Sequence, residues 1–363
     1  MIIRFVPGFQ SIIDQEKPLR QLFRILQTGN IPHAQLFTGL EGVGKTEAAF
    51  KFAMACNCRK AKIAADTISP KAGKAKLNFS SKLPCGECPS CRKITSGNHP
   101  DVIWIQPRNN QIRIARIREL HGMLALKPYE AGSRFVIISD VHHMNVEAAN
   151  SLLKVLEEPP QHTFLILTAH HLHDLLPTIT SRCQHVRFLP ISRVTLINYI
   201  KSQAGMSNLD AGLLANLAKG SLSKARQLAT SGWLQRRAWI LNIIAADPVR
   251  VKSVNSLTAL LAFSEKLAQS KEKLVEALEI LQTWFRDLIV FPSAPEKVMN
   301  QDRIRDLQRI AQQTDMHDKL SCYENIQTAL DRIDGNANPR LVLDVMLMNL
   351  VGFKHEKDCG YPV

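Results

Sequence analysis

The spacing of hydrophobic and polar positions changes along the chain and divides it into two halves. In the first half, short apolar runs of strand length alternate with segments whose apolar residues have helical spacing. Such alternation is typical of βαβ units and a mostly parallel sheet. The candidate strands begin at Ala34, Asp101, Arg134, Thr163 and His185. The pattern therefore predicts an α/β domain.

Two helices of this α/β region have clear boundaries in the sequence. One runs through GKTEAAFKFAMA from Gly44, directly after a glycine-rich turn. The other begins near Asn145 and meets Pro159 and Pro160 at its end. Proline lacks an amide hydrogen and its ring clashes with the preceding helical turn, so this pair is predicted to stop the helix.

After Pro190 the strand pattern fades and the rest of the chain is predicted to be helical. Residues 192–231 form one small helical unit, with apolar Leu213, Leu214, Leu217 and Leu222. In the segment that starts at residue 271, a stripe of apolar residues shares one helical face: Leu274, Leu278, Leu281, Phe285 and Leu288. A stripe of this kind contacts either the core or a partner helix, and we favour the core.

Composition narrows the class of protein. The 363 residues are enough for two or three domains, and 45% hydrophobic with 21% charged residues is ordinary for a globular protein. The net charge of +14 is compatible with an acidic partner such as nucleic acid. No segment is apolar and long enough to span a bilayer, and the N-terminus lacks the features of a signal peptide. Four of the eight cysteines fall in one region, and the other four, Cys56, Cys183, Cys322 and Cys359, follow no disulfide-like pattern. This usage favours a cytoplasmic location.

The segment GLEGVGKT, residues 39–46, has the spacing of a phosphate-binding P-loop. Gly39, Gly42 and Gly44 would let backbone amides wrap the phosphates. Lys45 would reach the β and γ phosphates, and the Thr46 hydroxyl would ligate Mg²⁺. Because a predicted strand precedes the loop and a helix follows it, we favour ATP binding over a chance glycine-rich turn.

A P-loop site also needs an acidic residue at the end of a neighbouring strand, and Asp140 has that position. We predict that Asp140 holds Mg²⁺; the alternative is a helix N-cap or turn residue. In many nucleoside triphosphatases a glutamate follows this aspartate and activates water. Here Val141 follows, and it cannot act as a base. The pocket is therefore predicted to bind ATP with negligible hydrolysis.

A cysteine cluster predicts a structural zinc site. Cys85, Cys88 and Cys91 lie in the turn PCGECPSC, and Cys58 upstream supplies a fourth sulfur. Four thiolates close a tetrahedral shell around Zn²⁺, whereas the alternative is a group of free buried thiols. Cys56 is the rival fourth ligand, but on a helix it would point away from the face of Cys58.

Two further groups of residues lie close to these motifs. The loop between the cysteines, residues 59–82, is rich in lysine, and we favour a solvated loop over a contact with a phosphate backbone. Its lysines include Lys60, Lys62, Lys71, Lys74, Lys76 and Lys82. Several histidines follow two predicted strands, and we favour surface histidines near the nucleotide pocket over a second metal site. They are His142, His143, His170, His171 and His173.

Several segments together resemble the bacterial DNA polymerase III clamp-loader ATPases of the AAA+ class. They are HAQLFTGLEGVGKT, the cluster of Cys58 with CGECPSC, NHPDV, IRELHGML, NSLLKVLEEPPQHTFLILTA and LLPTITSRCQ. The likeness is dense up to residue 230 and rests on pattern alone beyond it. It implies an AAA+ P-loop domain over residues 1–190 with a zinc module near 58–91, an all-α lid over 191–232 and an all-α C-terminal collar domain over 233–363.

The resemblance also implies roles for single residues. Thr168 matches the position that senses the γ-phosphate. Arg182, in the motif SRC, matches the arginine finger that reaches into the ATP site of the neighbouring subunit. The second sensor arginine of the family falls on Ser223, beside Lys224, so this chain departs from the family pattern there.

Within the family, motor subunits called tau or gamma carry Asp-Glu where this chain has Asp140 and Val141. The chain instead resembles the delta prime type, which lacks the glutamate. That type implies a hetero-oligomer with delta and tau or gamma subunits, which loads the sliding clamp onto primed DNA within the DNA polymerase (nucleotidyltransferase) holoenzyme. The alternatives are a motor subunit that hydrolyses ATP in the same loader, and a free-standing P-loop DNA-binding ATPase.

Overall fold

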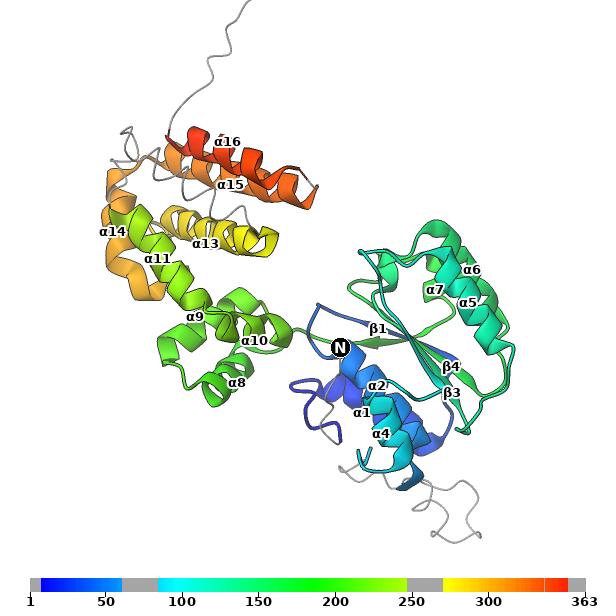
Figure 1. Ribbon diagram of the computed structural model, residues 1–363. Coiled ribbons are helices and arrows are strands. Elements are labelled where there is room, and N and C mark those ends of the chain that lie inside the picture. The colour runs from blue at the N-terminus through cyan, green and yellow to red at the C-terminus, as the bar shows by residue number, and fades with distance from the viewer. Residues whose placement is uncertain (1–7, 61–83, 247–269, 336, 352–363) are drawn as a thin grey trace, which may run out of the picture. The chain divides into compact units, whose positions relative to one another are not determined.

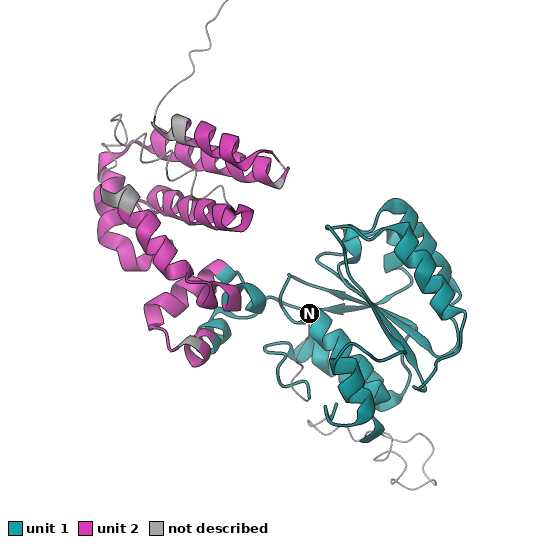
Figure 2. Cartoon of the chain, in the orientation of Figure 1, with its two compact units in different colours: residues 1–199, 218–225 teal, residues 200–217, 226–363 magenta. Residues whose placement is uncertain are grey.

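The computed structural model describes residues 8–60, 84–246, 270–335 and 337–351. It contains two compact units (Figure 2): unit 1 comprises residues 1–199 and 218–225, and unit 2 comprises 200–217 and 226–363. The expected domain boundaries at residues 190 and 232 stay a prediction. Of the lysines in the 59–82 loop, all but Lys60 lie outside the described residues.

Unit 1 contains a five-stranded parallel sheet with strand order β2-β3-β4-β1-β5. The strands are β1 Ala34–Thr38, β2 Val102–Ile105, β3 Arg134–Ile138, β4 Thr163–Ala169 and β5 Gln184–Arg187. All five predicted strands are thereby confirmed. Since β1 pairs with β4 and β4 with β3, the carboxyl ends of these three strands meet at one edge of the sheet.

Helices cover both faces of the sheet (Figure 1). On one face lie α1 Glu16–Thr28, α2 Lys45–Asn57 and α4 Pro89–Thr95; on the other lie α5 Ile114–Leu124, α6 Val146–Glu157 and α7 Pro177–Thr180. Each face of the sheet has its own hydrophobic core, and alternating side chains of β3 are buried in one core and then in the other. This follows because successive residues of a strand point to opposite faces. Phe135 and Ile137 enter the core with α2, whereas Val136 and Ile138 enter the core with α5 and α6.

The helix α2 is the central helix of the first core. Apolar and polar residues alike are buried along it, from Lys45 to Asn57. Its Phe50 meets Trp104 of β2 edge to face, with ring centroids 5.0 Å apart. A helix buried on most of its faces is held by its surroundings rather than by one apolar stripe. Its two ends are therefore fixed in position within unit 1.

Three helices occupy the stretch predicted to be a small helical unit. They are α8 Arg193–Ala204, α9 Asn208–Ala218 and α10 Leu222–Thr230. Leu213 and Leu214 are buried, as their spacing predicts, while Leu217 and Leu222 are half-buried. The helical nature of this stretch is thus confirmed.

Unit 2 continues with longer helices. They are α11 Trp233–Ala246, α13 Lys271–Val290, α14 Ile304–Gln313, α15 Met316–Asp334 and α16 Pro339–Val351, with short 3-10 turns η3 Pro295–Lys297 and η4 Gln301–Arg303. The predicted stripe on α13 is a core contact, with Leu274 and Leu278 fully buried. The prediction is wrong at one position of the stripe. Phe285 is only half-buried, whereas its neighbour Trp284 is fully buried in the core.

A buried carboxylate, Asp287 on α13, organises the segment after that helix. Its side chain is 0% exposed and accepts hydrogen bonds from the backbone amides of Met299 (2.9 Å) and Asn300 (2.7 Å). Arg237 of α11 donates to the side chains of Asn300 and Asp302 at 2.7 Å. These bonds satisfy charges that would be costly to bury alone. They also join α11 and α13 to the chain around residue 300.

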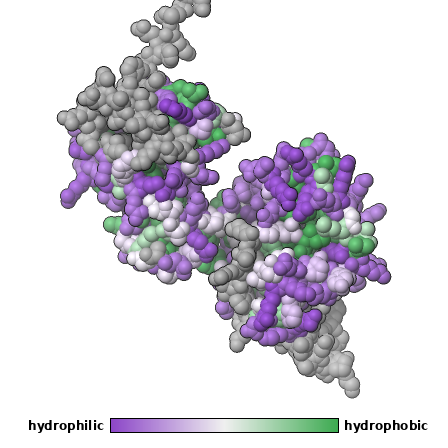
Figure 3. Space-filling view, viewed as in Figure 1, coloured by the Kyte–Doolittle hydropathy of each residue, from purple (hydrophilic) through white to green (hydrophobic). Residues whose placement is uncertain are grey.

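No helix of the described residues has both the length and the apolar character needed to cross a bilayer. The face seen in Figure 3 is mainly hydrophilic, with limited apolar areas between the polar ones.

Candidate nucleotide and metal sites

The P-loop connects the end of β1 to the start of α2, as the sequence predicts. Two of its glycines are required by their surroundings. Gly39 has φ +147°, and a Cβ there would lie 2.6 Å from the carbonyl oxygen of Phe188. Gly42 has φ +75°, and a Cβ there would collide with the side chains of Ser221 and Ser223. Larger residues would therefore disrupt the loop at either position.

The side chain of Lys45 folds back over this loop. Its ammonium donates to the carbonyl oxygens of Gly39 at 2.6 Å and Leu40 at 2.8 Å, and the residue is only 5% exposed. Burial lowers the pKa of Lys45 to about 8, although the charges of Asp140 and Glu41 oppose that shift. The cation is thus held at the loop where the motif places phosphate.

Asp140 lies two residues after the last residue of β3, at the carboxyl edge of the sheet. Its backbone has φ +52°, and its amide donates to the Thr168 hydroxyl at 3.0 Å. Asp140 precedes the short 3-10 turn η1 Val141–His143, but its side chain makes no capping hydrogen bond there. The structure therefore brings the predicted Mg²⁺ ligand beside the predicted γ-phosphate sensor. The predicted Mg²⁺ ligand Thr46 is half-buried in the first turn of α2.

The start of α10 contacts the P-loop within unit 1. The backbone amides of Leu222 and Ser223 both donate hydrogen bonds to the carbonyl oxygen of Gly42, with N···O distances of 3.1 Å and 3.4 Å. The hydroxyl oxygens of Ser221 and Ser223 are 3.3 Å apart. Ser223, which the resemblance matches to the second sensor arginine, therefore lies next to the loop and carries only a hydroxyl.

Arg182 lies between α7 and β5 and is not part of the group around Lys45. One terminal nitrogen forms an ion pair with Glu157 of α6 at 2.8 Å, and the other donates to the carbonyl oxygen of Thr178 at 3.0 Å. The side chains of Arg182 and Glu157 are 37% and 49% exposed. An exposed pair of this kind is worth about 0–1 kcal/mol, so it costs little to release the guanidinium.

The four predicted zinc ligands converge in unit 1. The sulfurs of Cys58, Cys85, Cys88 and Cys91 all lie within 4.8 Å of one another. Cys85 is 3.5 Å from Cys58 and 3.9 Å from Cys91, measured between sulfurs. Four sulfurs at the usual Zn–S distance of about 2.3 Å would be about 3.8 Å apart in a tetrahedron. The donor set and its spacing therefore fit Zn²⁺.

Local backbone structure explains why these cysteines meet. Cys58 is the C-cap of α2 and Cys88 is the N-cap of α4, so two helix ends deliver two of the sulfurs. The amide of Cys88 donates to the sulfur of Cys85 at 3.4 Å, a contact that stabilises a thiolate. The rival ligand, Cys56, is not part of the group, as the helical geometry predicts. Burial raises the pKa of Cys85; a bound dication would lower it again.

The histidines do not all behave as surface residues. His171 and His173 are exposed and stack on each other, with ring centroids 5.0 Å apart. His142 and His170 are half-buried, and their ring nitrogens lie within 4.8 Å of each other and of the Asp140 carboxylate. The preference for surface histidines over a second metal site stays a prediction for these two, which are half-buried beside Asp140. Burial lowers the pKa of both, which favours neutral imidazoles near pH 7.

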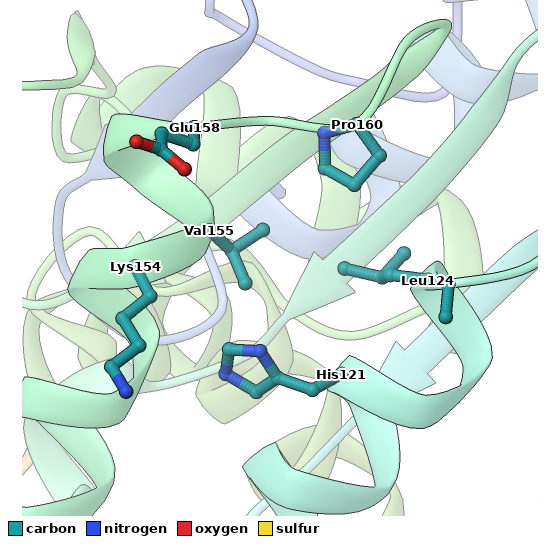
Figure 4. Close-up of a pocket in the computed structure, with 7 residues that line it drawn as sticks. His121, Leu124, Lys154, Val155, Glu158 and Pro160 are labelled. Carbon is teal, nitrogen blue, oxygen red and sulfur yellow. The ribbon is translucent and has the colours of Figure 1, made fainter.

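A pocket of about 220 Å³ lies elsewhere in unit 1, between α5 and α6 (Figure 4). Its wall includes the His121 ring, the ends of Lys154 and Glu158, and the apolar Leu124 and Val155. None of its lining residues belongs to the P-loop or to the cysteine cluster. We therefore place the candidate chemistry at the strand ends and not in this pocket.

A parallel sheet with a P-loop after β1 and an aspartate after β3 defines the class of α/β P-loop nucleotide-binding proteins. Comparison with known proteins narrows this class. The family described as DNA polymerase III, delta subunit, matches residues 14–192, and the one described as DNA polymerase III, delta subunit, C terminal, matches residues 231–351.

Individual relatives agree with the family matches. DNA polymerase III subunit delta' of Pseudomonas aeruginosa is 32% identical over 64% of this chain and 68% of its own length. Subunit delta' of Bacillus subtilis is 26% identical over 93% of this chain and 96% of its own. Subunit tau of B. subtilis is 27% identical over 98% of this chain, which spans 63% of tau. The chain belongs to the delta prime family of DNA polymerase III clamp-loader subunits.

Proposed function

We propose that the chain is a delta prime type subunit that helps a DNA polymerase III clamp loader place the sliding clamp on primed DNA. One observation carries this choice over a motor subunit. The residue after Asp140 is Val141, whose side chain is 2% exposed and belongs to the core with α5 and α6. A buried valine cannot polarise water, so the nucleotide site has its phosphate loop without the usual base.

The same proposal covers the nucleotide and the partners. The phosphates of ATP would be held by the P-loop residues Gly39, Gly42, Gly44, Lys45 and Thr46. Asp140 would bind Mg²⁺, and Thr168 would sense the γ-phosphate. The partners would be delta and tau or gamma subunits, with the clamp and primed DNA contacted through the complex. The helices of residues 233–363 would provide the oligomer contacts. The cysteine pattern and the delta prime relatives support a cytoplasmic location.

Reconstitution tests the subunit assignment directly. When the chain is co-expressed with the delta and the tau or gamma proteins of the same cell, we expect one complex on gel filtration that contains all three. The purified chain alone should show negligible ATP turnover because Val141 stands in place of the base. The proposal would be wrong if the chain remained apart from both partners. Steady turnover by the isolated chain that Lys45→Ala abolishes would instead favour the motor alternative.

We further propose one structural Zn²⁺ bound by the four cysteines, and its removal has a specific expected effect. Protein purified without chelators should contain about one zinc per chain, because four thiolates form a closed tetrahedral shell around Zn²⁺. Cys91→Ser should lose it and loosen residues 84–95 in hydrogen exchange. The P-loop should survive, because it lies at the opposite end of α2 from Cys58 and the other buried residues of that helix still pack in the core.

Cys56→Ser is the matched control for the zinc prediction. Cys56 is two residues from Cys58 but outside the sulfur group, so this variant should retain the metal. Metal analysis that finds no zinc in wild-type protein, or equal loss in both variants, would contradict the four-cysteine assignment.

A further inference from the structure

The strongest unassigned cluster in the described residues lies at the carboxyl ends of β3 and β4. One ligand atom each from Asp140, His142 and His170 falls within a 4.8 Å group. The two imidazole rings are 4.5 Å apart between centroids. The chain positions them from two neighbouring strands: η1, which begins three residues after β3 ends, carries His142, and His170 directly follows β4. Neighbouring parallel strands thus bring together side chains that are distant in sequence.

One atom of the cluster has an unmet bonding requirement. The Nδ1 of His142 is buried and has no hydrogen-bond partner in the described structure. A buried polar atom of this kind loses its hydrogen bond to water and gains none in the protein, which costs about 1–3 kcal/mol of stability. A cation bound through this nitrogen would satisfy it, because imidazole nitrogen is a common metal ligand.

The donor set selects the kind of ion. Mg²⁺ prefers oxygen ligands in octahedral geometry, whereas two imidazoles with one carboxylate suit first-row transition metals. We propose that Asp140, His142 and His170 bind one divalent transition-metal ion, such as Zn²⁺, independently of the four-cysteine cluster. Three protein ligands leave a coordination position open, unlike the closed shell of four sulfurs. This site goes beyond the proposed function, because it requires neither nucleotide nor a partner subunit.

Two adjacent histidines provide matched controls. His143 is next to His142, with ring centroids 4.3 Å apart, and His171 follows His170 in the sequence. Neither contributes to the ligand group. Replacing them removes the same side chain from the same two segments without removing a ligand.

Cobalt titration of nucleotide-free and Mg²⁺-free protein tests the proposal. The four-cysteine site is first filled with Zn²⁺, and Co²⁺ is then added while visible absorbance is recorded. We expect one Co²⁺ per chain, with weak d–d bands and without the intense charge-transfer band of a cobalt thiolate. His142→Ala and His170→Ala should each weaken Co²⁺ binding by at least about 100-fold, because losing a direct ligand exceeds the 10–100-fold effect of losing an outer-shell partner. His143→Ala and His171→Ala should bind as the wild type does.

Three results would overturn the proposal: no saturable Co²⁺ binding by the wild type, equal loss in the control variants, or a thiolate charge-transfer band that accounts for all of the bound cobalt and so places it at the cysteines. Retained zinc and an unchanged thermal melt verify that each variant is folded. If either histidine variant fails this check, Asp140→Asn substitutes for it, and unaltered Co²⁺ binding by that variant would equally refute the site.

Discussion

Arg182→Ala in a reconstituted loader is expected to slow ATP turnover at the adjacent motor subunit by about 10³-fold or more, within the range measured for arginine fingers. The guanidinium would neutralise charge that develops on the γ-phosphoryl oxygens of a neighbouring site. In the chain itself Arg182 pairs with Glu157 at 2.8 Å, with both side chains partly exposed. Since breaking that exposed ion pair costs little free energy, the variant should fold and assemble normally while clamp loading fails.

Glu157→Ala separates the two roles of this arginine. It breaks the same ion pair but leaves the guanidinium in place, so turnover and clamp loading should resemble the wild type. Arg182→Lys should restore only part of the rate, because an ammonium lacks the planar fork of the guanidinium. If Glu157→Ala and Arg182→Ala had equal effects, Arg182 would serve only to hold α6 against the segment before β5.

Lys45→Ala is expected to abolish binding of Mg²⁺-ATP by the isolated chain, because the phosphates lose the cation held at the loop. The wild type should also show a specific pH dependence. The pKa of Lys45 is lowered to about 8, so the lysine is charged below that pH and loses its proton above it. Affinity should be constant from pH 6.5 to 7.5 and then fall by up to about tenfold per pH unit above 8.

Isothermal titration in two buffers of different ionisation enthalpy measures this linkage. Above pH 8, binding should take up a proton, because phosphate favours the charged form of Lys45 and raises its pKa. Lys154→Ala is the control, since Lys154 lines the distant pocket on α6 and should change neither affinity nor its pH dependence. Affinity that stays constant from pH 7 to pH 9.5 would contradict the proposed role of Lys45.

The sequence predicted those parts of unit 1 that depend on local pattern. All five strands could be found because buried parallel strands are short continuous apolar runs between turns. The P-loop was visible because its glycines, Lys45 and Thr46 are adjacent in the chain. The grouping of Cys58 with the later cysteines was inferred because Zn²⁺ in a structural site binds four ligands. The sequence of the loop between them does not indicate that they are close in space.

Features that depend on contacts distant in the sequence could not be predicted. His142 and His170 form a group with Asp140 only because β3 and β4 are neighbours, and strand order is invisible in a single sequence. The contact of Ser223 with Gly42 arises in the same way. On α13, Trp284 and Phe285 are adjacent large aromatic residues, and the packing of the surrounding helices determines which one is buried.

The length of α2 is itself constrained by what lies at its two ends. The helix has 13 residues, begins at Lys45 and is capped by Cys58. Each added or removed residue would turn one end by about 100° relative to the other and shift it by about 1.5 Å. A single insertion or deletion would therefore pull either Lys45 off the loop carbonyls or Cys58 out of the sulfur group. The residue count of this helix can therefore change only if the P-loop or the cysteine cluster is lost.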